Sequence, residues 1–177
     1  INLLLVTYTF AADFNPLQPS KKDKCPVCGM FVFKYPDWVA QIIFTDGPVF
    51  FFYGAKDLFK FYFDIKKYSP EKSQKDIAAI YVTEYYEMKL IKAEDAFFVI
   101  GSDVYGPMGR ELIPLKTEAD AKQLLAEHQG RQQLEQAGAV QEPPNLGGFG
   151  HQQHEHHEGE GNGGSEEPAA LLWRVRV

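Results

Sequence analysis

Residues 38–68 read WVAQIIFTDGPVFFFYGAKDLFKFYFDIKKY, and this stretch decides the fold. Residues 38–44 and 49–53 are rich in β-branched and aromatic side chains and predict two strands, and the Asp-Gly-Pro turn between them predicts a hairpin. Gly54 ends the second strand, and residues 56–68 then place apolar side chains at helical spacing. Residues 77–83, IAAIYVT, predict a third strand. The order is therefore strand, strand, helix, strand.

The same order begins again further along the chain. Residues 88–93, 96–101 and 111–115 predict strands, and residues 118–129 predict a helix rich in Ala, Leu, Glu and Lys. No strand follows that helix directly, but residues 171–177, LLWRVRV, are strand-like and could supply the missing one. We therefore expect an α+β protein with two similar small lobes of strand-strand-helix-strand order and mostly antiparallel sheets.

These patterns divide the chain into four regions. Residues 1–23 form a signal remnant or N-terminal arm, 24–84 the first lobe, and 85–141 the second lobe with a helical extension or linker at 131–141. From residue 142 the composition changes to Pro-Pro, Gly-Gly and a His-rich stretch, which predicts a disordered tail over 142–177 because such a segment buries little apolar surface. The tail contains four histidines, His151, His154, His156 and His157. They could bind a metal ion weakly, and the alternative is that the segment is simply a solvated acidic tail.

The N-terminal residues 1–12 are almost entirely apolar, too few to span a bilayer but suited to the hydrophobic core of a signal peptide. A strand docked on the body is the alternative. A signal remnant would place the protein outside the cytoplasm and would allow membrane association through the N-terminus. The basic residues before Cys25 do not resemble a lipidation signal.

Composition excludes several functional classes. The 177 residues, 45% hydrophobic and 14% aromatic, suffice for one substantial core, and a net charge of −6 argues against nucleic acid as a partner. Outside the tail the chain has one histidine, and it contains no Gly-rich phosphate loop, nucleophile elbow or His-Glu-x-x-His motif. We therefore do not expect a conventional enzyme.

Residues 25–30, CPVCGM, contain both cysteines and one of the three methionines. The sulfur atoms of Cys25, Cys28 and Met30 are soft donors, which suit Cu(I) better than Mg²⁺ or Ca²⁺. Three alternatives remain open: a zinc site, which lacks a second ligand pair nearby; a thiol-disulfide pair, which lacks a following helix; and a structural disulfide or two buried thiols.

A second sulfur lies in the segment GSDVYGPMGRELIPL, residues 101–115. Met108 stands between Pro107 and Gly109, which predicts a turn that could present its thioether to a ligand. Packing over the core is the alternative for this residue.

Together, the Cys-Pro-x-Cys-Gly-Met and Pro-Met-Gly motifs and the sequence around them, over about residues 24–130, resemble the NosL family of copper-binding accessory proteins of nitrous-oxide reductase. The resemblance implies two similar lobes, a location in the periplasm or cell envelope of a bacterium, and handling of Cu(I) for a copper-requiring client enzyme or its maturation machinery. The positions that match are Cys25, Cys28, Met30 and Met108. A thiol-disulfide oxidoreductase using Cys25 and Cys28, or a zinc-stabilised interaction module, is the alternative function.

Overall fold

The structure, a computed structural model, describes residues 14–128 and 171–174. The apolar stretch at 1–12, the extension at 131–141 and the His-rich part of the predicted tail lie outside these residues. Within the described ranges, none of the helices has the length and apolar character needed to cross a membrane.

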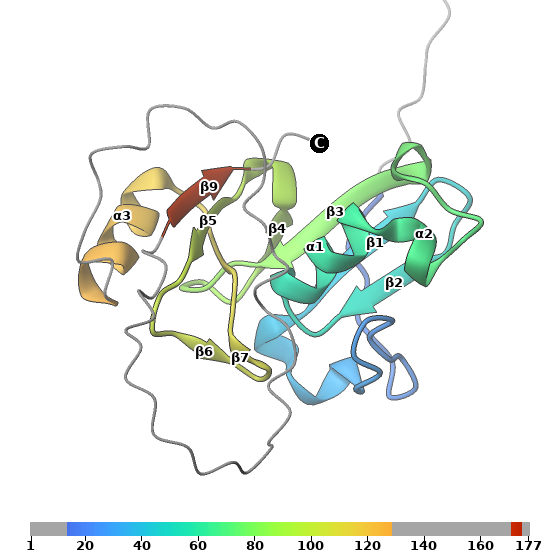
Figure 1. Cartoon of the computed structure of the whole chain (residues 1–177), viewed down its shortest axis with the longest axis horizontal. Helices are drawn as coiled ribbons and strands as arrows, with labels where there is room; N and C mark the ends of the chain where they lie inside the picture. Colours follow the sequence, from blue (N-terminus) through green and yellow to red (C-terminus); the bar gives the residue numbers. More distant parts are fainter. Residues whose placement is uncertain (1–13, 129–170, 175–177) are drawn as a thin grey trace, which may run out of the picture.

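The first sheet has four antiparallel strands in the order β2-β1-β3-β4 (Figure 1). Its strands are β1 (Ala40–Phe44), β2 (Val49–Phe52), β3 (Ile77–Thr83) and β4 (Leu90–Lys92). Between β2 and β3 the chain forms helices α1 (Ala55–Phe63) and α2 (Ile65–Tyr68). This unit has the strand-strand-helix-strand order that the sequence predicts, with β4 added at the edge.

The second sheet repeats this arrangement with three antiparallel strands in the order β8-β5-β9. Its elements are β5 (Phe97–Ile100), β8 (Ile113–Leu115), helix α3 (Glu118–Glu127) and β9 (Leu171–Arg174). In both sheets the first strand is central, the second strand lies on one side, and the strand after the helix lies on the other. The predicted fold class is confirmed, but the prediction of disorder throughout 142–177 is wrong for residues 171–174, which pair with β5 and supply the third strand.

Two details differ from the sequence prediction. The strand predicted at 88–93 exists as β4, but it pairs with β3 and so extends the first sheet instead of opening the second. The helix predicted over 56–68 is interrupted at Asp64, whose backbone leaves the helical region at φ −127° and ψ 48°. The boundaries proposed for the four regions remain predictions.

Helix α1 lies between the two larger sheets, and α3 covers the far side of the second sheet (Figure 1). Strand β5 is therefore buried on both faces. Phe98 joins the core around α1, where its ring meets that of Phe59 edge-on at 5.2 Å between centroids, whereas Val99 joins the core beneath α3 with Leu124. Alternate residues of one strand thus serve two cores.

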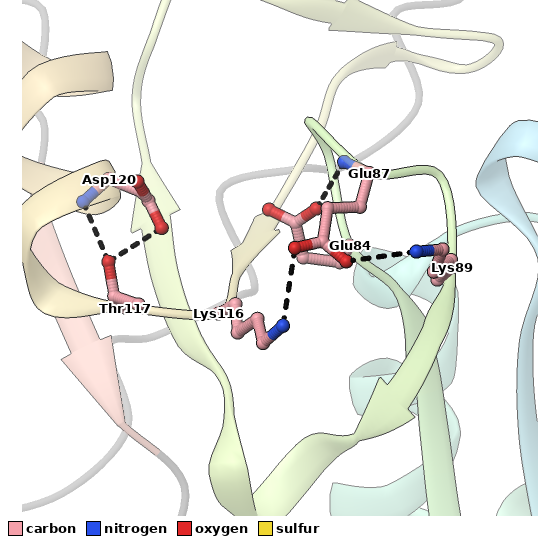
Figure 2. Close-up of polar contacts among 6 residues, drawn as sticks. All are labelled: Glu84, Glu87, Lys89, Lys116, Thr117 and Asp120. Atoms are coloured by element: carbon pink, nitrogen blue, oxygen red, sulfur yellow. Dashed lines mark hydrogen bonds and ion pairs between the residues drawn. The ribbon is translucent and has the colours of Figure 1, made fainter.

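Polar contacts on the surface join the β3–β4 turn to the second unit (Figure 2). Glu87 in that turn accepts hydrogen bonds from Lys116, which follows β8, at 3.2 Å and from Lys89 at 3.4 Å. Beside this ion pair, the backbone N–H of Tyr85 donates to the carbonyl of Pro114 at 2.9 Å. Thr117 begins α3 by accepting a hydrogen bond from the N–H of Asp120.

The pairing of β9 with β5 gives a test of this fold. Deleting residues 171–177 should lower the free energy of unfolding by about 2 kcal/mol or more, because four residues of β5 lose their partners in β9. Hydrogen exchange of the β5 amides should accelerate in parallel. Deleting residues 151–158 is the control, which should change neither quantity, and unaltered exchange in β5 after the first deletion would contradict the pairing.

Candidate metal centre

The CPVCGM segment forms a tight turn whose ends are joined by a bridge between Lys24 and Phe31. Inside it, the N–H of Cys25 donates to the carbonyl of Met30 at 2.9 Å, and the N–H of Gly29 donates to the carbonyl of Cys25 at 2.8 Å. Gly29 has a φ of +75°, a left-handed conformation that glycine adopts without strain. The glycine after the second cysteine is therefore required by the turn that brings the two thiols together.

The first turn of α1 supplies a third candidate ligand, Asp57. Its side chain is only 5% exposed, and its Oδ2 accepts a hydrogen bond from the Cys25 Sγ at 3.3 Å. The Sγ atoms of Cys25 and Cys28 and a carboxylate oxygen of Asp57 all lie within 4.8 Å of one another. Two soft sulfurs and one carboxylate thus converge at the surface end of the first core.

The two thiols differ in environment and in proton affinity. Both are free, Cys25 fully buried and Cys28 half-buried. Hydrogen bonding to Cys28, burial and the charge of Asp57 raise the pKa of Cys25, whereas the hydrogen bond from Cys25 and that from the Met30 backbone lower the pKa of Cys28. Cys28 therefore ionises before Cys25 as the pH rises.

A buried phenol lies beside this pair. The rings of Tyr35 and Tyr53 meet edge-on with centroids 4.5 Å apart. Tyr53 is 1% exposed, and its hydroxyl has no hydrogen-bond partner among the described residues. Burial, the neighbouring Tyr35 and the negative charge of Cys28 raise the pKa of Tyr53, so that this hydroxyl remains a neutral donor near the thiolate.

The Pro-Met-Gly segment forms the tip of a small hairpin made by β6 (Tyr105–Gly106) and β7 (Gly109–Arg110). Met108 is 39% exposed, as expected for a turn residue that does not pack in the core. The Nζ of Lys56 donates to the carbonyls of Met108 at 3.0 Å and Arg110 at 2.6 Å. Because Lys56 immediately precedes Asp57, these bonds attach the hairpin to the helical turn that carries the buried carboxylate.

A second buried carboxylate, Glu111, caps the same helix from the other unit. Its Oε1 accepts hydrogen bonds from the N–H of Lys56 at 2.7 Å and of Leu112 at 3.0 Å. Burial raises the pKa of Glu111 to about 7, against the opposing charge of Lys56. Gly54, at the N-cap, has no side chain to cap the helix, and the carboxylate of Glu111 takes that role.

The structure brings together two of the four ligands predicted from the sequence, Cys25 and Cys28. Met30 lies in the same turn and packs against the first core. Met108 is carried by a hairpin that Lys56 ties to the same turn of α1. Sequence reasoning missed Asp57, and no motif marks it, because an acidic residue in a first helical turn is common without any ligand. The role of each side chain as a ligand remains a prediction.

Comparison with known proteins identifies the family. The sequence profile of the NosL family matches residues 16–142, which is more than half of the chain. The chain belongs to the NosL family. The structure also resembles the crystal structure of the copper chaperone NosL from Shewanella denitrificans, with a TM-score of 0.54 and 23% identity over 64% of this chain and 87% of that one. No curated protein sequence matches it. The structural likeness, at this identity, shows that this NosL-family chain shares the fold.

The unequal thiols predict unequal reactivity toward an alkylating agent. In the reduced, metal-free protein, iodoacetamide should modify Cys28 first, with a pH midpoint below the ordinary cysteine value of 9.0, because its pKa is lowered and only the thiolate reacts. Asp57→Asn should move that midpoint lower still, since the charge of Asp57 opposes ionisation of Cys28. Peptide mass spectrometry across a pH series measures both effects, and faster modification of Cys25 would contradict this description.

Proposed function

We propose that this NosL-family protein carries one Cu(I) ion as cargo, held by Cys25, Cys28 and Met108 with Met30 as a supporting ligand. The observation that supports the proposal most strongly is the convergence of the two thiols on the helical turn to which the Met108 hairpin is attached. Thiolate and thioether sulfur favour Cu(I) over harder ions. The copper chaperone named among the structural relatives shares the fold and supports the same assignment.

Some of the proposed site's side chains are buried and others are accessible to solvent, which suits a protein that must pass its metal ion to a partner. Cys25 and Asp57 are buried, whereas Cys28 is half-buried and Met108 is exposed. We propose that a client's ligand approaches from the side of Cys28 and Met108 and displaces them in turn, while Cys25 still holds the ion. Loading requires Cys25 to lose its proton, and Asp57, which accepts a hydrogen bond from that thiol, is the group through which the proton leaves.

We place the protein outside the cytoplasm, in the periplasm or cell envelope of a bacterium, with no catalytic role of its own. Its client would be a copper-requiring enzyme or the machinery that matures it, and nitrous-oxide reductase is the client that the family resemblance implies. Purified Cu(I)-loaded protein should then transfer copper to the copper-free reductase.

The contribution of Met108 can be measured by competition with a chromophoric Cu(I) chelator under reducing, anaerobic conditions. Met108→Leu keeps the volume and removes only the sulfur, so Cu(I) affinity should fall by about tenfold or more, while the stability of the metal-free protein changes by less than about 1.5 kcal/mol. Met108→His should restore part of the affinity, because imidazole also binds copper.

Met88→Leu is the matched control, because Met88 is exposed in the β3–β4 turn and is not among the proposed ligands. Its Cu(I) affinity should equal that of the wild type. A wild type that retains Zn²⁺ as firmly as Cu(I), or that reduces insulin disulfides, would favour the zinc or the oxidoreductase alternative over copper transport.

A further inference from the structure

We propose that Lys56 and Glu111 act as a latch, which we define as these two side chains and the hydrogen bonds they make between α1 and the β6–β7 hairpin. The latch fixes the Met108 hairpin to the helical turn that carries Asp57 and so sets the Cu(I) affinity without touching the ion. This inference rests on the proposed function, since it needs Met108 to be a ligand. It assigns positioning roles to two residues outside the sulfur motifs.

The hairpin cannot hold its own position. It has two residue pairs, Tyr105 with Arg110 and Gly106 with Gly109, and a two-stranded hairpin of this size is marginal in water. Its sheet is separate from the two larger ones. A ligand carried on such an element is presented in many positions unless another part of the protein fixes it, and ordering it on binding would cost conformational entropy.

Lys56 supplies the first attachment. Its side chain is 6% exposed, and its ammonium group donates to two carbonyls of the hairpin, those of Met108 and Arg110. A buried ammonium group is retained only where it has such partners, because its desolvation is otherwise costly. One of the two bonds is made to the proposed ligand residue itself.

Glu111 supplies the second attachment, at the point where the chain leaves β7. Glu111 is 2% exposed, and its carboxylate accepts a hydrogen bond from the backbone N–H of Lys56. Glu111 therefore holds the backbone of Lys56, while the side chain of Lys56 holds the hairpin. Two glycines leave room for the carboxylate: a Cβ on Gly54 would lie 2.6 Å from Glu111 Oε2, and one on Gly106 would lie 3.1 Å from Glu111 Cβ. Larger residues at these positions would displace it.

The consequence for copper follows from the order of residues on α1. Lys56 binds the Met108 hairpin and Asp57 binds the thiol of Cys25, so consecutive residues of one helical turn connect the two parts of the proposed site. Breaking the latch frees the thioether but leaves the cysteine turn and Asp57 in place. Affinity should then fall to the level of a site without Met108.

A double-mutant cycle separates positioning from general support of the fold. Cu(I) affinity is measured by chelator competition for the wild type, Lys56→Met, Met108→Leu and the double variant, each as the full chain. If Lys56 positions Met108, Lys56→Met should lose about tenfold in affinity, and adding Met108→Leu should cost less than about twofold more, because the thioether is already lost to the site. Lys66→Met, which removes the hydrogen bond from this α2 lysine to the carbonyl of Pro70, should bind as the wild type does.

Two outcomes overturn the latch: unchanged affinity in Lys56→Met, or losses that multiply in the double variant. In either case, a tenfold loss in Met108→Leu alone would leave the proposed copper function standing, whereas no loss in that variant would overturn both the latch and the ligand role of Met108. If Lys56→Met does not fold, Gly54→Ala decides in its place, because its methyl group displaces the Glu111 carboxylate while φ at this position, 173°, suits any residue. For this pair, a double variant of Gly54→Ala and Met108→Leu that binds Cu(I) almost as well as Gly54→Ala alone supports the latch. Losses of affinity that multiply overturn it.

Discussion

Burial of ionisable side chains at the N-terminus of α1 is the constraint on which the rest of this structure depends. Lys56, Asp57 and Glu111 are each almost fully removed from water, and charged groups in such surroundings need partners. Their partners are the carbonyls of Met108 and Arg110 in the β6–β7 hairpin, the Cys25 thiol and the backbone N–H of Lys56. The requirement to provide partners for three buried ionisable side chains therefore brings together segments that are far apart in the sequence.

The repeated topology explains why the second sulfur motif lies where it does. In the first unit, β1 and β2 are joined by a tight turn at Asp46 and Gly47, whereas the corresponding strands of the second unit, β5 and β8, are separated by the longer segment that forms β6 and β7. Because α1 lies between the two sheets, this segment can reach the N-terminus of the helix that belongs to the first unit. One unit thus provides the cysteines and the other provides Met108.

Much of this arrangement could be predicted from the sequence, and the exceptions have physical reasons. Strand runs and amphipathic spacing located the strands of the two larger sheets and the main helices, but alternation within β4 carries no information about its partner, and pairing with β3 placed it in the first sheet. The helical pattern continues through Asp64, so the break between α1 and α2 was not visible. The sulfur motifs were conspicuous because cysteine and methionine are few. Asp57, Lys56 and Glu111 were not, because their function depends on burial created by distant segments.

We propose that Met108 and the cysteine turn belong to one Cu(I) site, and the methionine methyl groups report on this site directly. The chain contains three methionines, so protein labelled with ¹³C at these methyl groups should give three resonances. Adding one equivalent of Cu(I) to the reduced protein should shift the Met108 resonance and leave that of Met88 unchanged. A Met108 resonance that stays in place while copper binds would contradict the account.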